Sequence, residues 1–423
     1  MPTSSREPAT AGTGTAIATR GARRLRVLCL DIEGGHGGSS RSLHGVLAAI
    51  DRTRVEPEVW CRSPGGLSFY TRIGVPCRVE PELPRFSAGS YRLRDNLSQL
   101  RRSIPGFLRA RSLVWRLAET IEHCFDVVHF NHTAFFLLAR WLRRYTRKAF
   151  VMHLRTQTPN SFLGRWQART IQRTMTGCVF ITENEASHHA SLCPSLRGQV
   201  IYNPFVDAAV EPLPSELMPD VRGRTVIASL GNYSWYRGID RLIDVARVLK
   251  KRERRDILFA VAGDMRLSAT LPGILGEVGA RGGTLADVAA HYGVEDAFTF
   301  LGHISAPERL IVASRAVVTL TREANPWGRA VIEALGLGRP VLGIGTWSRF
   351  IEHGATGFLY PHFDAKQVAS DIIRLADEPA YAATLGAQGR TRILQLCNAS
   401  DRAADLLGVW EKAAESETAS VSH

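Results

Sequence analysis

Short apolar runs alternate with longer amphipathic stretches in the first half of the chain. Residues 24–32, RLRVLCLDI, form a partly β-branched apolar run of the kind that makes a buried parallel strand. A glycine-rich loop follows, and then a helical stretch for which Ser39 and Ser40 are candidate N-caps. Five later runs also predict strands, with helical stretches between them: 56–61, 126–130, 149–154, 178–182 and 199–203. This alternation predicts a doubly wound α/β domain.

The same alternation restarts in the second half. A run that ends in Gly231 predicts a strand, and residues 239–252 carry apolar side chains at helical spacing. Further strands are expected at 257–264, 298–302, 316–321 and 339–344. The chain is therefore expected to fold into the following parts: a disordered tail at 1–23, an N-terminal domain at 24–205, a linker at 206–224, a C-terminal domain at 225–390, a helix at 391–413 and a tail at 414–423.

The charge is uneven along the 423 residues. The net charge is +13, and it comes from residues 1–205, which hold 29 Lys and Arg against 14 Asp and Glu. A basic half suggests an anionic partner such as nucleic acid, anionic lipid or a phosphorylated substrate.

The 7 cysteines are scattered, with no C-x-x-C pair, which favours reduced thiols in a cytosol over disulfides or a zinc site. No run approaches the ~18 apolar residues of a membrane-spanning helix.

Two charged residues of the second half are candidate ligand contacts. Arg237 lies just before a helix, from where its planar guanidinium could reach a diphosphate; a solvated arginine is the alternative. Glu333 lies in an otherwise apolar helix that Pro340 ends. Arg329 is four residues earlier, so a surface ion pair is one interpretation, although base before acid is the weaker order. A carboxylate that holds two ribose hydroxyls is the other.

Together, these spacings resemble the family 4 retaining glycosyltransferases over about residues 24–390. GNYSWYRG, from Gly231 to Gly238, looks like the family's G-R-x-x-x-x-K-G pattern, and NPWGRAVIEA, from Asn325, is similar to its E-x7-E signature. VVH, VIYNP and GATGFLYP are similar to other family landmarks and occur in the expected order. The resemblance implies the GT-B fold, in which two Rossmann-like, doubly wound domains face a central cleft.

The resemblance also implies roles for single residues. Glu333 corresponds to the acid that holds the ribose of a nucleotide sugar, and Arg237 to the lysine that contacts the diphosphate and assists its departure. The implied donor-binding residues are Glu333, Asn325, Gly328, Arg237, Asn232, Gly37 and Gly38. Two of them depart from the family pattern. Asn232 replaces the arginine of the G-R pair, and Asn325 replaces the first acid of E-x7-E, which contacts donor-sugar hydroxyls; Glu323 is a candidate substitute.

Polar residues at two strand ends are candidates for the acceptor side. Family members place a functional histidine at such a strand end, and His153 and His132 are the candidate catalytic histidines, with hydrogen-bonding structural roles as the alternative. His129, between two apolar neighbours, is expected to be structural. The implied acceptor-side residues are Arg155, Asn131 and His36.

Two basic segments suggest a surface for an anionic membrane. Residues 91–118 carry seven arginines among apolar and aromatic side chains, and residues 140–148 add further basic residues. Ordinary helices with a solvated basic face are the alternative. We expect a cytoplasmic protein, peripheral on the cytoplasmic face of the membrane.

The resemblance therefore implies a retaining glycosyltransferase of the hexosyltransferase type. It would move a sugar from a nucleoside diphosphate sugar to a lipid-linked acceptor or to a precursor in polysaccharide biosynthesis. No D-x-D pair is present, so neither a metal nor a cofactor is expected. Other GT-B enzymes, such as a nucleotide-sugar epimerase or a phosphorylase, and an inactive nucleotide-binding homologue are the alternatives. A nucleic-acid partner is not expected, because no known binding module is recognisable.

Overall fold

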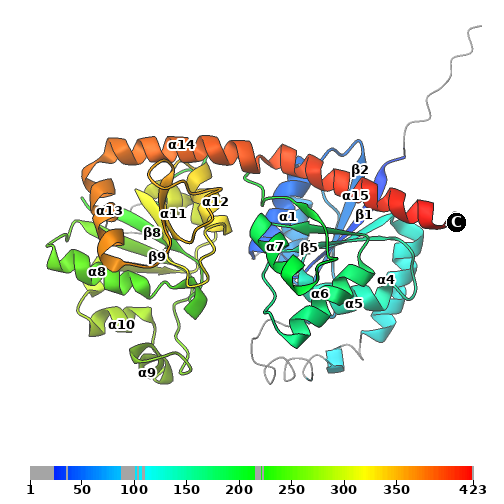
Figure 1. Cartoon of the computed structure of the whole chain (residues 1–423), viewed down its shortest axis with the longest axis horizontal. Coiled ribbons are helices and arrows are strands. Elements are labelled where there is room, and N and C mark those ends of the chain that lie inside the picture. The colour runs from blue at the N-terminus through cyan, green and yellow to red at the C-terminus, as the bar shows by residue number, and fades with distance from the viewer. Residues whose placement is uncertain are drawn as a thin grey trace, which may run out of the picture.

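The computed structural model describes residues 23–34, 37–86, 101, 104–106, 110–214, 221 and 223–421. It contains two α/β domains that lie side by side (Figure 1). The N-terminal domain has a parallel sheet of seven strands in the order β3-β2-β1-β4-β5-β6-β7. Its strands are β1 (Leu25–Asp31), β2 (Val55–Cys61), β3 (Cys77–Val79), β4 (Val127–Phe130), β5 (Ala149–Leu154), β6 (Gly177–Phe180) and β7 (Gln199–Val200).

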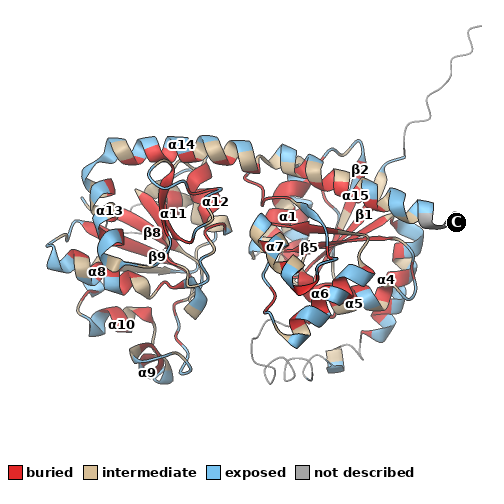
Figure 2. Cartoon of the chain, in the orientation of Figure 1, coloured by how far each residue is buried: buried red, intermediate tan, exposed pale blue. Residues whose placement is uncertain are grey.

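Helices cover both faces of this sheet. The described helices are α1 (Gly38–Ala49), α2 (Gly65–Thr71), α4 (Arg111–Cys124), α5 (Phe136–Leu142), α6 (Phe162–Thr174) and α7 (Glu183–Leu192), with the short helix η1 (Thr133–Phe135) before α5. Side chains of β1 alternate between two cores, because Leu28 packs with α4, α5 and α6 while Val27 packs with α1. Strands buried on both faces explain the continuous apolar runs (Figure 2).

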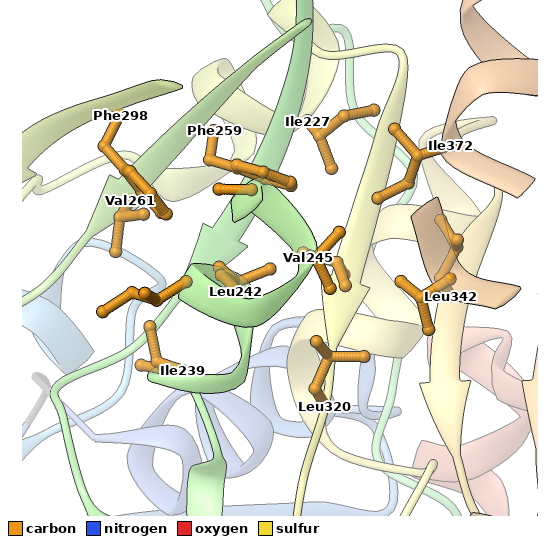
Figure 3. Close-up of a cluster of buried hydrophobic side chains, with 14 of the residues drawn as sticks. Ile227, Ile239, Leu242, Val245, Phe259, Val261, Phe298, Leu320, Leu342 and Ile372 are labelled. Carbon is orange, nitrogen blue, oxygen red and sulfur yellow. The ribbon is translucent and has the colours of Figure 1, made fainter. Parts of the chain in front are cut away.

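The C-terminal domain repeats this architecture with six parallel strands in the order β10-β9-β8-β11-β12-β13. The strands are β8 (Thr225–Leu230), β9 (Ile257–Ala262), β10 (Phe298–Gly302), β11 (Ala316–Thr319), β12 (Val341–Ile344) and β13 (Gly357–Tyr360). The helices are α8 (Arg241–Lys251), α9 (Ile274–Ala280), α10 (Leu285–His291), α11 (Pro307–Ala313), α12 (Arg329–Gly336) and α13 (Ala365–Asp377), with the short helices η4 (Trp235–Arg237) and η5 (Glu295–Ala297). Leu242 and Val245 of α8 pack on strand residues such as Ile227 and Phe259 (Figure 3). The predicted two-domain, doubly wound fold is confirmed.

The C-terminal end of the chain differs from the expected single helix over 391–413. Two helices are present, α14 (Pro379–Cys397) on the C-terminal domain and α15 (Ala399–Val421) on the N-terminal domain (Figure 1). The break falls at Asn398, whose side chain accepts hydrogen bonds from the amides of Ser400 and Asp401, as an N-cap does. The segment expected as a tail from residue 414 continues α15. Trp410 of this helix is fully buried in the N-terminal core.

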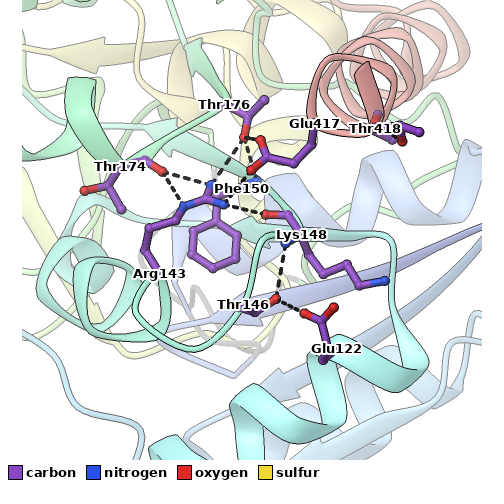
Figure 4. A network of polar contacts seen from close by, with 10 residues as sticks. Glu122, Arg143, Thr146, Lys148, Phe150, Thr174, Thr176, Glu417 and Thr418 are labelled. Carbon is purple, nitrogen blue, oxygen red and sulfur yellow. Dashed lines mark hydrogen bonds and ion pairs between the residues drawn. The ribbon is translucent and has the colours of Figure 1, made fainter. Parts of the chain in front are cut away.

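A polar network fixes the far end of α15 to the N-terminal domain (Figure 4). The Arg143 guanidinium donates to the carbonyls of Thr174 and Lys148 and to the Glu417 carboxylate at 3.0 Å. It also lies over the ring of Phe150, 4.1 Å from the ring centroid. Arg143 belongs to the basic segment 140–148, but these contacts give it a structural role inside the domain. Arg140, Arg144 and Arg147 of the same segment are exposed.

Candidate active site

A polar network lies at the carboxyl ends of β1, β4 and β5, on the side of the N-terminal domain that faces the other domain. Asp31 ends β1 and is fully buried. Its carboxylate accepts from Ser40 Oγ at 2.6 Å, Tyr70 OH at 2.8 Å, Asn131 Nδ2 at 3.0 Å and the Gly34 amide at 3.2 Å. Four donors around one carboxylate stabilise its charge and fix the start of the glycine-rich loop. Sequence reasoning missed Asp31, although an acid that ends an apolar strand before such a loop is a usable signal.

Arg155, predicted on the acceptor side, joins this network. Its guanidinium donates to Asn131 Oδ1 at 2.6 Å and to Asn203 Oδ1 at 2.8 Å, and contacts His153 Nδ1 at 3.2 Å. Burial lowers the pKa of Arg155 to about 10, against the opposing effect of the Asp31 carboxylate. Arg155 is therefore charged at neutral pH. The structure brings together Arg155, Asn131 and His153 as one hydrogen-bonded group.

The two candidate catalytic histidines belong to this polar edge of the N-terminal domain, and the pKa of each is lowered. Burial and the charge of Arg155 hold the pKa of His153 well below its ordinary value, and they lower the pKa of His132 to about 4. His132 Nδ1 accepts from the Ala134 amide at 3.0 Å, which caps η1. His153 Nε2 has no hydrogen-bond partner among the described residues. Each ring thus uses Nδ1 for a structural contact, and a chemical role would fall to Nε2.

His129, expected to be structural, is fully buried. Its Nδ1 accepts from Trp410 Nε1 of α15 at 3.2 Å, and burial lowers its pKa to about 3. The remaining acceptor-side candidate, His36, lies outside the described residues. Gly37 is the N-cap of α1 and Gly38 its first residue, so the glycine loop leads directly into a helix N-terminus, as the sequence indicates.

Glycines directly follow two strands of the C-terminal domain. Gly231 follows β8 with φ 117° and Gly263 follows β9 with φ 131°, a region that favours glycine. A Cβ on Gly231 would lie 1.9 Å from Arg237 Nη1, so the guanidinium covers this backbone. Arg237 ends η4, is exposed, and forms no ion pair with another residue of the described chain. Asn232 accepts from the Asp264 amide at 3.0 Å and so closes the turn after β9.

Asn325 lies on the loop before α12. Its Nδ2 donates to Glu323 Oε2 at 3.2 Å, so the candidate substitute acid is its neighbour in space as well as in sequence. Between them, Ala324 has φ 51°, a left-handed conformation that costs energy in a residue with a Cβ. Such strain fixes how the loop presents the amide and carboxylate at its tip.

Glu333 lies where the two domains meet and is 9% exposed. Its Oε1 accepts from Arg329 Nη2 at 2.6 Å and Nε at 3.2 Å, so the ion pair weighed from the sequence is present. It is not a surface pair, however, because Arg41 of α1 lies 3.4 Å from the same oxygen and Arg329 Nη1 donates to Ser42 Oγ at 3.0 Å. The starts of α1 and α12, with the predicted residues Gly38, Gly328 and Glu333, therefore lie together.

A second contact between the domains joins Trp327 to Glu185, and the sequence did not predict it. Trp327 Nε1 donates to Glu185 Oε1 of α7 at 2.9 Å, and the Thr182 hydroxyl donates to the same carboxylate. Glu185 is 3% exposed, and this burial raises its pKa to about 7. Trp327 also packs edge-on against Trp347, with ring centroids 5.5 Å apart.

The described residues contain neither a helix able to span a membrane nor a cluster suited to a metal ion. None of the helices in that part of the chain combines the length and apolar character needed to cross a bilayer. Nor do the described residues contain three or more His, Cys, Asp and Glu side chains grouped so that they could hold a metal ion.

Comparison with known proteins identifies the family. The Glycosyl transferase 4-like domain matches residues 37–204, and Glycosyl transferases group 1 matches residues 220–392. The α-D-kanosaminyltransferase of Streptomyces kanamyceticus is 25% identical over 227 residues, which span 51% of this chain and 55% of that protein. This match thus covers about half the length of each protein.

Solved structures show the same fold. The structure of Anabaena HepE in complex with UDP-glucose matches with a TM-score of 0.69 at 20% identity, covering 91% of this chain and 100% of that one. Sucrose-phosphate synthase from Thermosynechococcus elongatus matches with a TM-score of 0.65 at 19% identity, covering 92% and 99%. These two family domains, in the expected order along the chain, and the shared fold show that the chain belongs to the group 1 glycosyltransferases of the GT-B fold.

Proposed function

We propose that the protein transfers a sugar from a nucleoside diphosphate sugar to an acceptor with retention of the anomeric configuration. The observation that supports this most is the position of Glu333, which belongs to α12 and contacts Arg41 of α1. In the described chain, its recorded contacts all fall on Oε1 and none on Oε2, which leaves one oxygen for ribose hydroxyls. The similar Anabaena protein has a structure with UDP-glucose, which agrees with a donor of this class.

The difficult step in such a transfer is the departure of the diphosphate. Negative charge grows on its oxygens in the transition state, so a fixed cation and free amides are worth most there. Arg237, over the strand end at Gly231, supplies the cation. The first amides of α12 supply donors and a favourable dipole. With these groups in place, we propose that the reaction needs no metal, and that the leaving phosphate takes the proton of the acceptor.

The donor sugar and the acceptor are the finer parts of the proposal. Asn325 matches the motif position whose acid contacts donor-sugar hydroxyls in the family, and Glu323 bonds to it, so this pair is proposed to set the donor preference. The acceptor is proposed to be lipid-linked or a glycan precursor. The kanosaminyltransferase relative makes a kanosaminyl group a second candidate for the transferred sugar, which a screen of donors should include.

The proposed acceptor fits an anionic membrane surface on the N-terminal domain. Trp115, Tyr145, Phe162 and Trp166 of the α4–α6 layer are exposed large hydrophobic residues, with Trp115 58% and Phe162 80% exposed. Exposed arginines lie beside them on the same helices. Aromatic and basic side chains together suit the interface of an anionic bilayer. The Trp115→Ala, Phe162→Ala double variant should sediment less with anionic vesicles than the wild type; unchanged sedimentation would refute this surface.

Donor binding tests the central proposal. A panel of nucleotide sugars should contain one that raises the melting temperature, because a ligand that binds the folded state stabilises it by mass action. Glu333→Ala should abolish that shift and lower the affinity in calorimetry by ~100-fold or more, as expected for the loss of two charge-assisted hydrogen bonds of about 1.5 kcal/mol or more each.

A matched control is available for this variant. Glu378 also follows an arginine by four residues and pairs with it at 3.4 Å, but on the surface of α13. Glu378→Ala should leave donor affinity unchanged. Intact donor affinity in the Glu333→Ala variant would show that Glu333 does not hold the donor.

A further inference from the structure

We propose that Arg329 at the start of α12 binds the diphosphate of the donor, as a second cation of the C-terminal domain besides Arg237. This inference rests on the proposed function and deepens it, because it gives the Arg329–Glu333 pair a joint task. Glu333 would accept from ribose while Arg329 donates to the phosphate next to it.

A role in helix stability explains Arg329 poorly. It is the first residue of α12, where the helix dipole disfavours a positive charge. It precedes its acid by four residues, which is the weaker order and contributes about 0.3–0.5 kcal/mol on an exposed helix. Its side chain is only 20% exposed and reaches the other domain. These features indicate a role outside the helix itself.

The contacts of Arg329 fix its guanidinium and leave donors free. The Nε–H group and one N–H of Nη2 donate to Glu333 Oε1, and one N–H of Nη1 donates to Ser42 Oγ. Ser42 Oγ in turn donates to the Gly38 carbonyl at 2.9 Å, so its orientation is set. A guanidinium has five N–H donors, and two of them have no recorded partner in the described chain. The group is thus held in place by two domains and still carries free donors.

The surroundings of Arg329 are those of a phosphate site. A Cβ on Gly38 would lie 3.5 Å from Arg329 Cδ, so the arginine lies against the glycine loop at the start of α1. No side chain caps α1 or α12, so the first amides of both helices have no side-chain acceptor and are available to an anion. Arg41 occupies the remaining space at Glu333 Oε1, which directs further ligands to Oε2.

The chemistry of a nucleotide matches this pair. The carboxylate oxygen Oε2 accepts from hydroxyls, and the free N–H groups of Arg329 donate to an anion with bidentate geometry. In a nucleoside diphosphate, ribose hydroxyls and phosphates are neighbours on one short segment. One ion pair can therefore recognise the junction between the ribose and the diphosphate.

The experiment compares ligands that differ only in the phosphates. Affinities for UDP and for uridine are measured by calorimetry for the wild type, Arg329→Ala and Glu333→Ala, with the matching pair used if the donor screen selects another base. Arg329→Ala should lower UDP affinity ~10-fold or more and change uridine affinity less than 2-fold, as expected for a lost charged hydrogen bond. Glu333→Ala should lower both affinities. Arg329→Lys should recover part of the UDP affinity, because it keeps the charge.

The outcomes separate the two proposals. Equal losses of UDP and uridine affinity in Arg329→Ala would show that Arg329 only positions Glu333, and no loss would show that it has no part in binding. Either result overturns this inference and leaves the donor assignment standing. A wild-type protein that binds neither ligand nor any nucleotide sugar overturns the proposed function as well. Arg374→Ala, at the surface pair with Glu378, is the control and should match the wild type.

Discussion

The two edges that face each other across the domains are built in opposite ways. The N-terminal edge is filled by its own side chains, since Asp31, Asn131, Arg155 and His153 bond to one another. The C-terminal edge has glycines with positive φ after β8, β9 and β12, and the exposed guanidinium of Arg237. Most polar groups of the N-terminal edge have partners within the domain, with His153 Nε2 as an exception. The C-terminal edge offers open backbone and, at Arg237, a guanidinium that forms no ion pair within the described chain. This difference supports our proposal that the donor binds at the C-terminal edge, with the N-terminal edge opposite it.

This difference should separate stability from activity. A buried polar group that loses its partner costs free energy of folding, because neither water nor protein replaces the contact. Arg237 is exposed and forms no ion pair with the described residues, so its removal breaks no such contact there. Mutations at the N-terminal edge should therefore act on folding first, and mutations at the C-terminal edge should act on ligands and turnover.

The largest expected effect is at Asp31. Asp31→Ala leaves four donors inside the domain without their acceptor and should lower the free energy of unfolding by about 4 kcal/mol. Urea unfolding followed by tryptophan fluorescence measures this loss. The paired variant, Arg237→Ala, should unfold within about 0.5 kcal/mol of the wild type but turn over ~10²–10³-fold more slowly.

Either of two results would contradict this contrast between the edges. A stable Asp31→Ala protein would mean that the N-terminal network is not holding the loop. An Arg237→Ala protein with normal turnover would mean that the leaving diphosphate depends on another cation, for which Arg329 is the nearest candidate.

The sequence predicted the described strands of both sheets except the short edge strands β3 and β13, and it predicted the helix that carries Glu333, because buried parallel strands and amphipathic helices leave local patterns. It did not predict the partners of single residues. Arg329 bonds to Ser42 and Trp410 to His129, and in each pair the two residues are more than 280 positions apart. The periodicity of α15 likewise indicated a helix, but nothing local shows that it covers the first domain. The local pattern of apolar and polar residues predicts helices and strands, whereas the contacts between these elements depend on the assembled fold.

Glu185 does not follow the contrast between the two edges. It is a buried polar residue of the N-terminal domain, like Asp31, but one of its two donors, Trp327, comes from the C-terminal domain. Its carboxylate has two donors where Asp31 has four. Burial therefore dominates, and the pKa of Glu185 rises from about 4.5 to about 7. The contact between the domains is expected to depend on pH through this residue.

The smallest expected effect is the pH dependence at Glu185. A raised folded-state pKa means that the folded protein binds a proton that the unfolded chain releases, so stability from this group is present below pH 4.5 and is lost as the pH rises to about 7. The loss amounts to at most about 3 kcal/mol, at 1.36 kcal/mol for each pKa unit. Glu185→Gln keeps an oxygen for Trp327 Nε1 and cannot ionise. Urea unfolding at pH 5 and pH 8 should therefore find the variant and the wild type similar at pH 5 and the variant more stable at pH 8. Because the titrations of His129, His132 and His153 are common to both proteins, their contributions cancel in this difference. A difference that stays constant between the two pH values would show that Glu185 is ionised throughout, and that the contact between the domains does not respond to pH through it.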